Sequence, residues 1–260
     1  EDSTVVVADL RGYGDSSCPT AGDDHVGYTK RAMAADMVKV METLGFESFD
    51  VIGHDRGARV TYRMALDHPE AVTRMMSLDV VPTLDMWEGT DKARAIGAFH
   101  WPFLAQPAPL PEKMIGADPE FFAAWLMRSW AAPGFKFHPD AMSEYLRCFA
   151  KSDVIRATCD DYRAAATIDH DLDQRDRDSG RRISCPVHFL WGGDRNHGGP
   201  QGGARDLRGR LLAARHQLLL LLPRVQVPAG PAGGLTPALP NTNGREALGP
   251  PVFCSGQFLA

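Results

Sequence analysis

Residues 49–59 read Phe-Asp-Val-Ile-Gly-His-Asp-Arg-Gly-Ala-Arg, an apolar run that leads into a glycine-flanked aspartate and then into a helical pattern. Gly53 and Gly57 stand two places on either side of Asp55, where small residues allow a strained turn between strand and helix. Such a turn is a nucleophile elbow, which presents its central side chain at the end of a sheet. We therefore predict that Asp55 is a nucleophile in front of the positive end of a helix dipole. The alternative is an aspartate that only caps the helix.

A carboxylate in this position indicates displacement at a saturated carbon atom. Aspartate attacks such a carbon to form an alkyl ester with the protein, whereas acyl transfer usually employs serine or cysteine. Hydrolysis of the ester then requires a base, normally a histidine that a second carboxylate orients. Asp79, at the end of the next predicted strand, is the expected orienting carboxylate, and Asp194 is the weaker candidate. An ordinary turn aspartate is the alternative for Asp79.

Two arginines follow the predicted nucleophile. Arg56 and Arg59 are three positions apart, so they share one face of the predicted helix beside Asp55. The chain has a net charge of −5 and a pI near 6.0, which gives no general attraction for nucleic acid or an anionic membrane. We therefore expect the pair to bind a small anionic substrate in a pocket. Two exposed surface charges are the alternative, because most helical arginines are exposed.

Apolar patterns along the chain alternate between strands and helices. This alternation predicts the α/β class, with a doubly wound, mostly parallel sheet. We expect a core of residues 1–82 and 183–194, with an inserted helical cap at 83–182 whose charged segment 169–182 is a solvated connection. We expect strands at residues 4–9, 49–53, 75–80 and 185–191, and the first of them should be buried and parallel to its neighbours. We expect core helices at residues 33–44 and 56–67, and the methionines of the first helix should lie in the core.

The composition changes after Asp194. Glycine and proline supply 19 of the 66 residues in 195–260, which contain no Lys, Ile, Met, Tyr or Trp. This bias favours a divergent or disordered tail, and a disrupted reading frame would leave the same composition. No apolar stretch is long enough to span a bilayer. The five cysteines lack disulfide or zinc spacing, which favours reduced thiols, no metal site and a cytoplasmic location.

Several motifs resemble those of fluoroacetate dehalogenases, which belong to the α/β-hydrolase superfamily. The resemblance covers about residues 4–193 and is carried by Gly53 to Arg59, Thr29 to Ala34, Leu78-Asp79, His100-Trp101, Phe103 to Glu112 and Asp161 to Ala164. It implies an α/β-hydrolase fold with a helical cap, and hydrolysis of haloacetates to glycolate and halide without metal or organic cofactor. It further implies a homodimer.

The resemblance also implies roles for individual residues. Asp55 is the nucleophile, and Arg56 and Arg59 clamp the substrate carboxylate. The departing halide is held by His100, Trp101 and Tyr162, for which ordinary packing within the cap is the alternative. Trp130 matches a tryptophan that lines the pocket, and core packing is the alternative there too.

The sequence departs from the family in two places. Nothing in it matches the family's first strands and His-Gly loop, so we expect the strand at residues 4–9 to lack its usual neighbours. The family's Ser-Gly-His-Phe-Leu motif has its nearest counterpart at residues 255–259, with Gln257 at the histidine position. Glutamine cannot accept a proton, so we expect the ester on Asp55 to persist and turnover to be impaired. The alternatives are an epoxide hydrolase and a non-catalytic, degenerate fragment.

Overall fold

A five-stranded sheet carries the predicted elbow. The computed structural model describes residues 4–22, 24–132, 134–190 and 220–223. The strands are β1 (Val6–Val7), β2 (Phe49–His54), β3 (Val72–Leu78), β4 (Val187–Leu190) and β5 (Leu220–Pro223), in the spatial order β1-β5-β2-β3-β4. The parallel pairs β2–β3 and β3–β4 lie as the α/β pattern predicts. The register places His54 opposite Leu78, so β2 and β3 end side by side.

The other edge of the sheet differs from the prediction. The segment expected to be a buried parallel strand at 4–9 forms only the two-residue β1, which pairs antiparallel with β5, and Val7 is 40% exposed. Strand β5 also pairs antiparallel with β2. It comes from the segment that the composition assigned to a disordered tail. The neighbour of β1 in the described sheet is thus the antiparallel β5 and not a further N-terminal strand, which agrees with the expectation that β1 lacks its usual neighbours.

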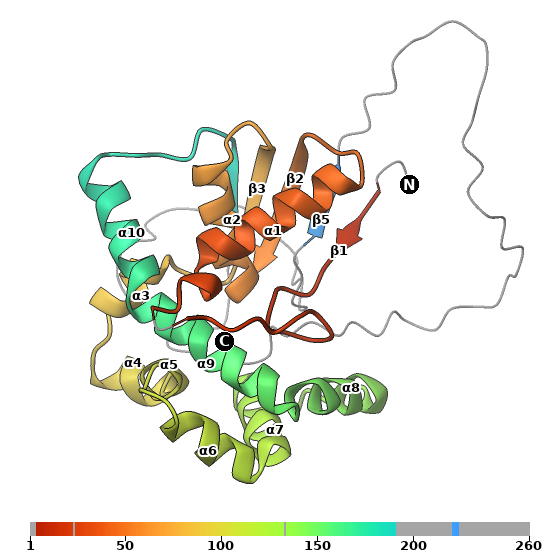
Figure 1. Cartoon of the computed structure of the whole chain (residues 1–260), viewed down its shortest axis with the longest axis vertical. Coiled ribbons are helices and arrows are strands. Elements are labelled where there is room, and N and C mark those ends of the chain that lie inside the picture. Colours follow the sequence, from red (N-terminus) through yellow and green to blue (C-terminus); the bar gives the residue numbers. More distant parts are fainter. Residues whose placement is uncertain (1–3, 23, 133, 191–219, 224–260) are drawn as a thin grey trace, which may run out of the picture.

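Two helices connect the strands and cover one face of the sheet (Figure 1). Helix α1 (Lys30–Thr43) begins after Thr29, whose hydroxyl accepts a hydrogen bond from the Ala32 N–H, and Gly45 follows it with a φ of 86°. Helix α2 (Arg56–Asp67) has the predicted bounds and packs on β2, β3 and α1. The methionines of α1 enter the core as predicted, since Met33, Met37 and Met41 are buried with Phe49 and Val51 of β2.

The described residues between Thr83 and Asp178 form helices, as predicted for the cap. They are α3 (Thr83–Glu88), α4 (Lys92–Gly97), α5 (His100–Leu104), α6 (Leu110–Ala117), α7 (Pro119–Trp130), α8 (Pro139–Phe149), α9 (Ser152–Ala166) and α10 (Ile168–Asp178). Outside the cap, the 3-10 helix η1 (Val26–Tyr28) precedes α1. Figure 1 shows α4 to α8 gathered at one end of the molecule, with α9 between them and the sheet. They have their own core, which includes Leu104, Leu126 and Ile155.

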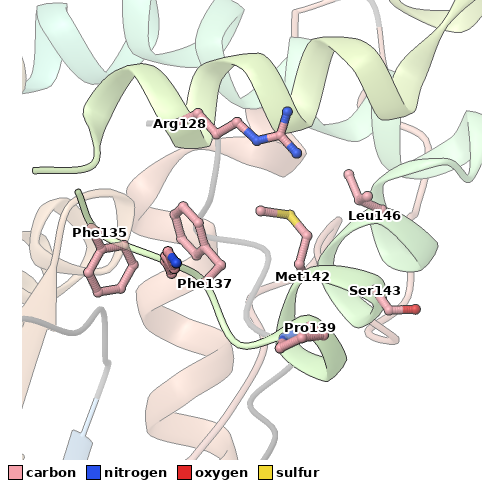
Figure 2. A pocket seen from close by; sticks show the side chains of 8 residues that line it. Arg128, Phe135, Phe137, Pro139, Met142, Ser143 and Leu146 are labelled. Carbon is pink, nitrogen blue, oxygen red and sulfur yellow. The ribbon is translucent and has the colours of Figure 1, made fainter. Parts of the chain in front are cut away.

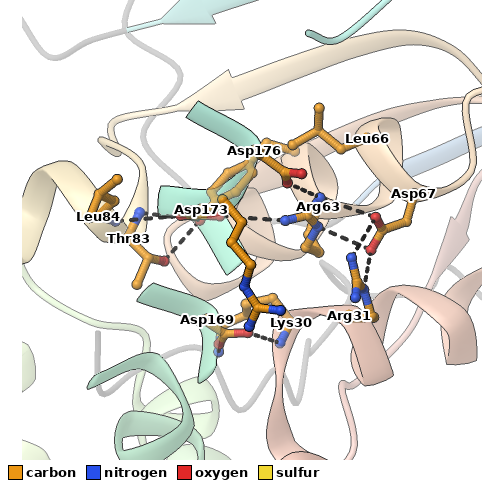
Figure 3. A network of polar contacts seen from close by, with 12 residues as sticks. Lys30, Arg31, Arg63, Leu66, Asp67, Thr83, Leu84, Asp169, Asp173 and Asp176 are labelled. Atoms are coloured by element: carbon orange, nitrogen blue, oxygen red, sulfur yellow. Dashed lines mark hydrogen bonds and ion pairs between the residues drawn. The ribbon is translucent and has the colours of Figure 1, made fainter. Parts of the chain in front are cut away.

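Helix α10 corrects the prediction of a solvated connection at 169–182. Its Asp169 is 2% exposed, and its Asp176 pairs with the buried Arg63 of α2 at 2.5 Å. Tyr62 of α2 donates to Asp173 at 2.7 Å, and Figure 3 shows Asp173 and Asp176 beside Arg63. Asp173 and Asp176 of α10 therefore pair with Arg63 of α2, and the sequence pattern alone did not reveal that partner.

Two further observations concern the cysteines and the helices of the described residues. Of the cysteines within the described residues, Cys18, Cys159 and Cys185 carry free thiols. Cys148 is disulfide-bonded, so the expectation of reduced thiols is wrong at that position. Among the described segments, none of the helices combines the length and apolar character that a bilayer crossing requires.

Replacing Gly53 with alanine is expected to destabilise the protein. An added Cβ would lie 2.6 Å from the carbonyl carbon and oxygen of Gly57, and backbone at the first turn of α2 cannot move aside cheaply. Overpacking of this kind costs about 1–3 kcal/mol, so the melting temperature should fall by several degrees. Gly116→Ala is the matched control, because nothing lies within 4 Å of its added Cβ. Equal melting temperatures for the two variants would contradict this account of the elbow.

Candidate active site

Asp55 has the strained backbone that a nucleophile elbow requires. Its φ of 53° and ψ of −119° lie outside the regions that non-glycine residues ordinarily occupy, at the junction of β2 and α2. The side chain is half-buried, and its Oδ2 atom is fully buried without a hydrogen-bond partner in the described chain. Asp55 makes no side-chain hydrogen bond as the cap of α2, so the capping alternative does not account for its position.

Arg56 is buried, with 1% of its surface exposed, and it is already ion-paired. Its Nε donates to Oδ2 of Asp161 at 2.7 Å, and its Nη2 lies 2.7 Å from Oδ1 of the same carboxylate. The guanidinium carbon lies 4.2 Å from the centre of the Tyr162 ring. Within the described residues, Nη1 is buried and has no partner. Arg56 is therefore a fixed cation with one donor atom left for a ligand.

Arg59 is buried without a carboxylate partner in the described residues. Its Nη1 donates to the Val81 carbonyl at 2.8 Å, and its Nε is buried and unpartnered. Its guanidinium carbon lies 4.5 Å from the centre of the Trp101 ring. Burial and the neighbouring Arg56 cation lower the pKa of Arg59, and the negative charge of Asp55 partly opposes them. An anion bound beside Arg59 would relieve this unfavourable burial. Because Arg56 and Arg59 are both buried, the alternative that they are exposed surface charges is wrong.

Aromatic side chains from the cap surround the arginines. Trp101 and Tyr162 are buried and meet edge to face, with ring centroids 5.4 Å apart. His100 lies 5.9 Å from Tyr162 and 4.8 Å from Trp130, both measured between ring centroids. The four side chains that the resemblance assigns to the halide and the pocket wall therefore lie together, beside Arg56 and Arg59.

His100 is buried as a neutral imidazole. Both of its ring nitrogens are buried without partners among the described residues, although the ring is only 3% exposed. Burial and the Arg56 and Arg59 cations lower its pKa to about 3. A neutral imidazole keeps one N–H donor, and two unused ring nitrogens in a protein interior are costly unless a ligand engages them.

The pKa of His100 predicts a pH dependence of stability. The unfolded chain binds a proton on this histidine near pH 6.5, while the folded protein resists it down to pH 3. The contribution is therefore fully present above about pH 6.5 and is lost as the pH falls toward 3, by roughly 1.4 kcal/mol per pH unit. We expect the free energy of unfolding of His100→Gln, from urea titrations at about pH 4.5 and 6.5, to fall less than that of the parent. Equal losses in both proteins would exclude this neutral histidine.

The predicted orienting carboxylate lies where the sequence placed it. Asp79 directly follows β3 with a φ of 52°, one strand away from Asp55 and at the same edge of the sheet. Its N–H donates to the Leu190 carbonyl of β4 at 2.7 Å, and the residue as a whole is exposed. Asp194 and Gln257 lie outside the described residues.

Several groups that hold this site were not predicted from the sequence. Asp161 of α9 pairs with Arg56, and it also accepts hydrogen bonds from Lys30 and from the Tyr13 hydroxyl. In the sequence, Asp161 and Lys30 each stood only within a family motif. A buried lysine is unusual enough that its sequence position alone predicts an exposed one.

Two other features of the described surface do not belong to this site. A groove of about 600 Å³ on the cap lies between α7 and α8, and none of the predicted site residues lines it (Figure 2). Asp15, Glu144 and Cys148 lie close enough together to suggest metal ligands. Arg147 and Lys151 already pair with those carboxylates, so surface ion pairs account for the cluster.

Comparison with known proteins supports the fold. A family model of the α/β hydrolase fold matches residues 2–220. Fluoroacetate dehalogenase from Burkholderia sp is 49% identical over 185 residues, which cover 71% of this chain and 60% of that protein. Soluble epoxide hydrolase from Corynebacterium sp. (strain C12) is 28% identical over 213 residues, which cover 74% of this chain and 65% of that protein. The chain thus spans somewhat under two thirds of the length of these relatives.

Solved structures agree with the sequence comparison. The crystal structure of ALR0039 from Nostoc sp PCC 7120, a proposed α/β hydrolase, superimposes with a TM-score of 0.68 at 52% identity. That match covers 71% of this chain and 63% of the Nostoc chain. The family match includes the elbow at Asp55, the parallel strands around it and the helices beyond it. The chain therefore belongs to the α/β hydrolase fold family.

Proposed function

We propose that this protein removes halide from haloacetates, with fluoroacetate as the favoured substrate, through an ester on Asp55 that water then hydrolyses to glycolate. One observation carries the proposal. Among the described residues, two buried guanidinium groups each keep an N–H without a partner, near a carboxylate that also has a buried oxygen without a partner. The similarity to the Burkholderia fluoroacetate dehalogenase supports the same reaction class.

The arginines would select and orient the substrate. A haloacetate has little apolar surface, so its binding free energy must come mainly from charge-assisted hydrogen bonds to its carboxylate. Arg56 Nη1 and Arg59 Nε, which have no partner in the part of the chain that the structure describes, would donate to that carboxylate. Binding the carboxylate there leaves the halogenated carbon to face the oxygen of Asp55, which gives the near-attack geometry that accelerates displacement.

In the first step, an oxygen of Asp55 would form a bond to the substrate carbon while the carbon–halogen bond breaks. The electron pair of that bond leaves with the halide. Fluoride is a poor leaving group, so hydrogen-bond donors must stabilise its developing charge, as in an oxyanion hole. His100, Trp101 and Tyr162 would supply donors from imidazole, indole and phenol. The cationic faces of Arg56 and Arg59 lie against two of those rings.

In the second step, water would attack the ester carbonyl of Asp55 with the help of a base. We propose that Asp79 orients that base, because it lies at the adjacent strand end. With glutamine at position 257, proton removal from water should be slow. We therefore expect each protein molecule to release its first halide ion much faster than later ones.

Halide release tests the function directly. The protein is mixed with fluoroacetate, and free fluoride is followed with an ion-selective electrode. We expect a burst that approaches one fluoride per protein molecule, followed by a much slower phase. Steady release without a burst would refute the impaired second step, and no release from fluoroacetate, chloroacetate or bromoacetate would refute the dehalogenase proposal.

An epoxide hydrolase is the second candidate, favoured by the similarity to the Corynebacterium enzyme and by the buried phenol of Tyr162. A neutral epoxide, however, would leave two buried cations without an anionic partner beyond Asp161 and Asp55. We therefore rank it below haloacetate hydrolysis. Diol formation from styrene oxide, with no fluoride from fluoroacetate, would reverse that order.

A further inference from the structure

Asp161 is a fully buried carboxylate whose two oxygens are both occupied. Oδ2 accepts from the Tyr13 hydroxyl at 2.5 Å and from Arg56 Nε at 2.7 Å. Oδ1 accepts from Lys30 Nζ and lies 2.7 Å from Arg56 Nη2. Burial alone would raise the pKa of Asp161, but the Arg56 and Lys30 cations outweigh it and keep the group ionised. The carboxylate is therefore a permanent anion between two cations.

These contacts join parts of the chain that are distant in sequence. Tyr13 lies in the loop after β1, Lys30 opens α1, Arg56 opens α2 and Asp161 lies in α9. Arg56 Nη2 also donates to the backbone carbonyl of Asp161 at 3.2 Å. A guanidinium group held in this way by Nε and Nη2 cannot rotate in its own plane, because it is a rigid fork. Its remaining donor, Nη1, has one fixed direction.

Arg59 offers a contrast on the same helix. Its Nη1 contacts the Val81 carbonyl and, at 3.4 Å, the Thr83 hydroxyl. Neither partner carries a charge, and neither forms a two-pronged contact with the guanidinium. The orientation of the Arg56 guanidinium is therefore fixed by its contacts, whereas the contacts of Arg59 hold its guanidinium in place without fixing its orientation.

We propose that Asp161, held by Lys30 and Tyr13, is the positioning residue that aims Arg56 Nη1 at the carboxylate of the substrate. Asp161 touches neither substrate nor nucleophile and acts only through Arg56. The inference rests on the proposed function, because it takes the haloacetate carboxylate as the ligand of Arg56. It predicts that Asp161 sets the orientation of the bound acid, and with it the rate of Asp55 alkylation.

Asp169 supplies a matched control. It is 2% exposed, lies 3.5 Å from Lys30 Nζ and accepts from the Lys30 N–H at 2.9 Å (Figure 3). Asp161 and Asp169 are thus both buried carboxylates beside Lys30, but the contacts to Arg56 are made by Asp161. Asp161→Asn and Asp169→Asn each remove one negative charge beside Lys30.

The experiment measures alkylation of the full chain by chloroacetate, by intact mass, as a function of time and concentration. Asp161→Asn is expected to lower the limiting rate by roughly 10- to 100-fold, since small misplacements of a clamp cost about that much. Asp169→Asn should stay within about threefold of the parent. Folded Asp161→Asn protein that alkylates at the rate of Asp169→Asn would overturn the proposal. If Asp161→Asn does not melt cooperatively, Lys30→Met/Asp161→Asn, which restores the net charge, is compared with Lys30→Met in the same way.

Acetate binding by calorimetry separates this proposal from the proposed function, because acetate engages the arginines without reacting. If the parent protein binds acetate at least about tenfold more tightly than Asp161→Asn but is not alkylated, the dehalogenase function is refuted and the positioning role is supported. Parent protein that is alkylated but matches Asp161→Asn in both measurements would sink the positioning role alone. Parent protein that neither binds acetate nor is alkylated would sink both.

Discussion

Asp55→Ala is expected to lower the initial release of fluoride from fluoroacetate by about ten-thousand-fold or more, to the level of the uncatalysed reaction. Removing a nucleophile deletes the covalent step itself, so neither the arginines nor the halide donors can compensate. The elbow holds this residue at a φ of 53°, and Asp55→Ala leaves that backbone strain in place, because alanine tolerates the conformation no better. The measurement is the initial fluoride burst with fluoroacetate in excess.

A second carboxylate on the same strand controls for non-specific damage. Asp50 of β2 is buried and pairs with Arg74, with no contact to the arginines after the elbow. Asp50→Asn should be less stable than the parent. The fraction of Asp50→Asn that remains folded should still show most of the initial fluoride burst. If Asp55→Ala retained fluoride release within tenfold of the parent, Asp55 would not be the nucleophile.

Arg59→Met is expected to lower the second-order rate of fluoride release by about 100- to 1,000-fold, while the melting temperature changes little. Charge-assisted hydrogen bonds contribute about 1.5–3 kcal/mol each, and the substrate would lose such a bond and a nearby cation. Stability should hold because burial and Arg56 already disfavour the Arg59 cation, as its lowered pKa indicates. Methionine removes that charge and keeps most of the side-chain volume.

Arg63 on the same helix should behave in the opposite way. It is also 1% exposed, but it pairs with Asp67 at 3.0 Å and with Asp176 at 2.5 Å. Arg63→Met would remove a buried cation from these half-buried carboxylates, which keep Arg31 and Arg181 as other partners, at a cost of about 1.5–3 kcal/mol for each charged hydrogen bond lost. We expect a large fall in melting temperature for Arg63→Met and a small one for Arg59→Met. A reversed order, or an unchanged fluoride rate in Arg59→Met, would contradict the assigned roles.

The parts of this protein that could be predicted from sequence are those with local causes. A side chain at Gly53 would collide with the backbone of Gly57 where β2 passes into α2, so the elbow, the bounds of α2 and the burial of its arginines followed from one short motif. Helix α1 was predicted from the spacing of its methionines and its glycine stop. The register of β2 and β3 then brought Asp79 to the same edge as Asp55.

The parts that could not be predicted depend on partners far away in the chain. The charges of α10 indicated a solvated connection, but Arg63 of α2 pairs with two of them. Asp161 of α9 reaches Arg56 across 105 positions, and no local pattern marks such a contact. Strand β1 looked like a buried parallel strand from its β-branched residues, but its neighbour in the sheet is the antiparallel β5.

The central claim is that a side-chain oxygen of Asp55 bonds covalently to the substrate carbon. The most direct test is peptide mapping by mass spectrometry after brief incubation with chloroacetate or fluoroacetate, followed by acid quench. We expect one peptide to gain the mass of a carboxymethyl group, and fragmentation to place that group on Asp55. Unmodified Asp55 in protein that has released a full equivalent of halide, or a carboxymethyl group on another residue, would contradict the account.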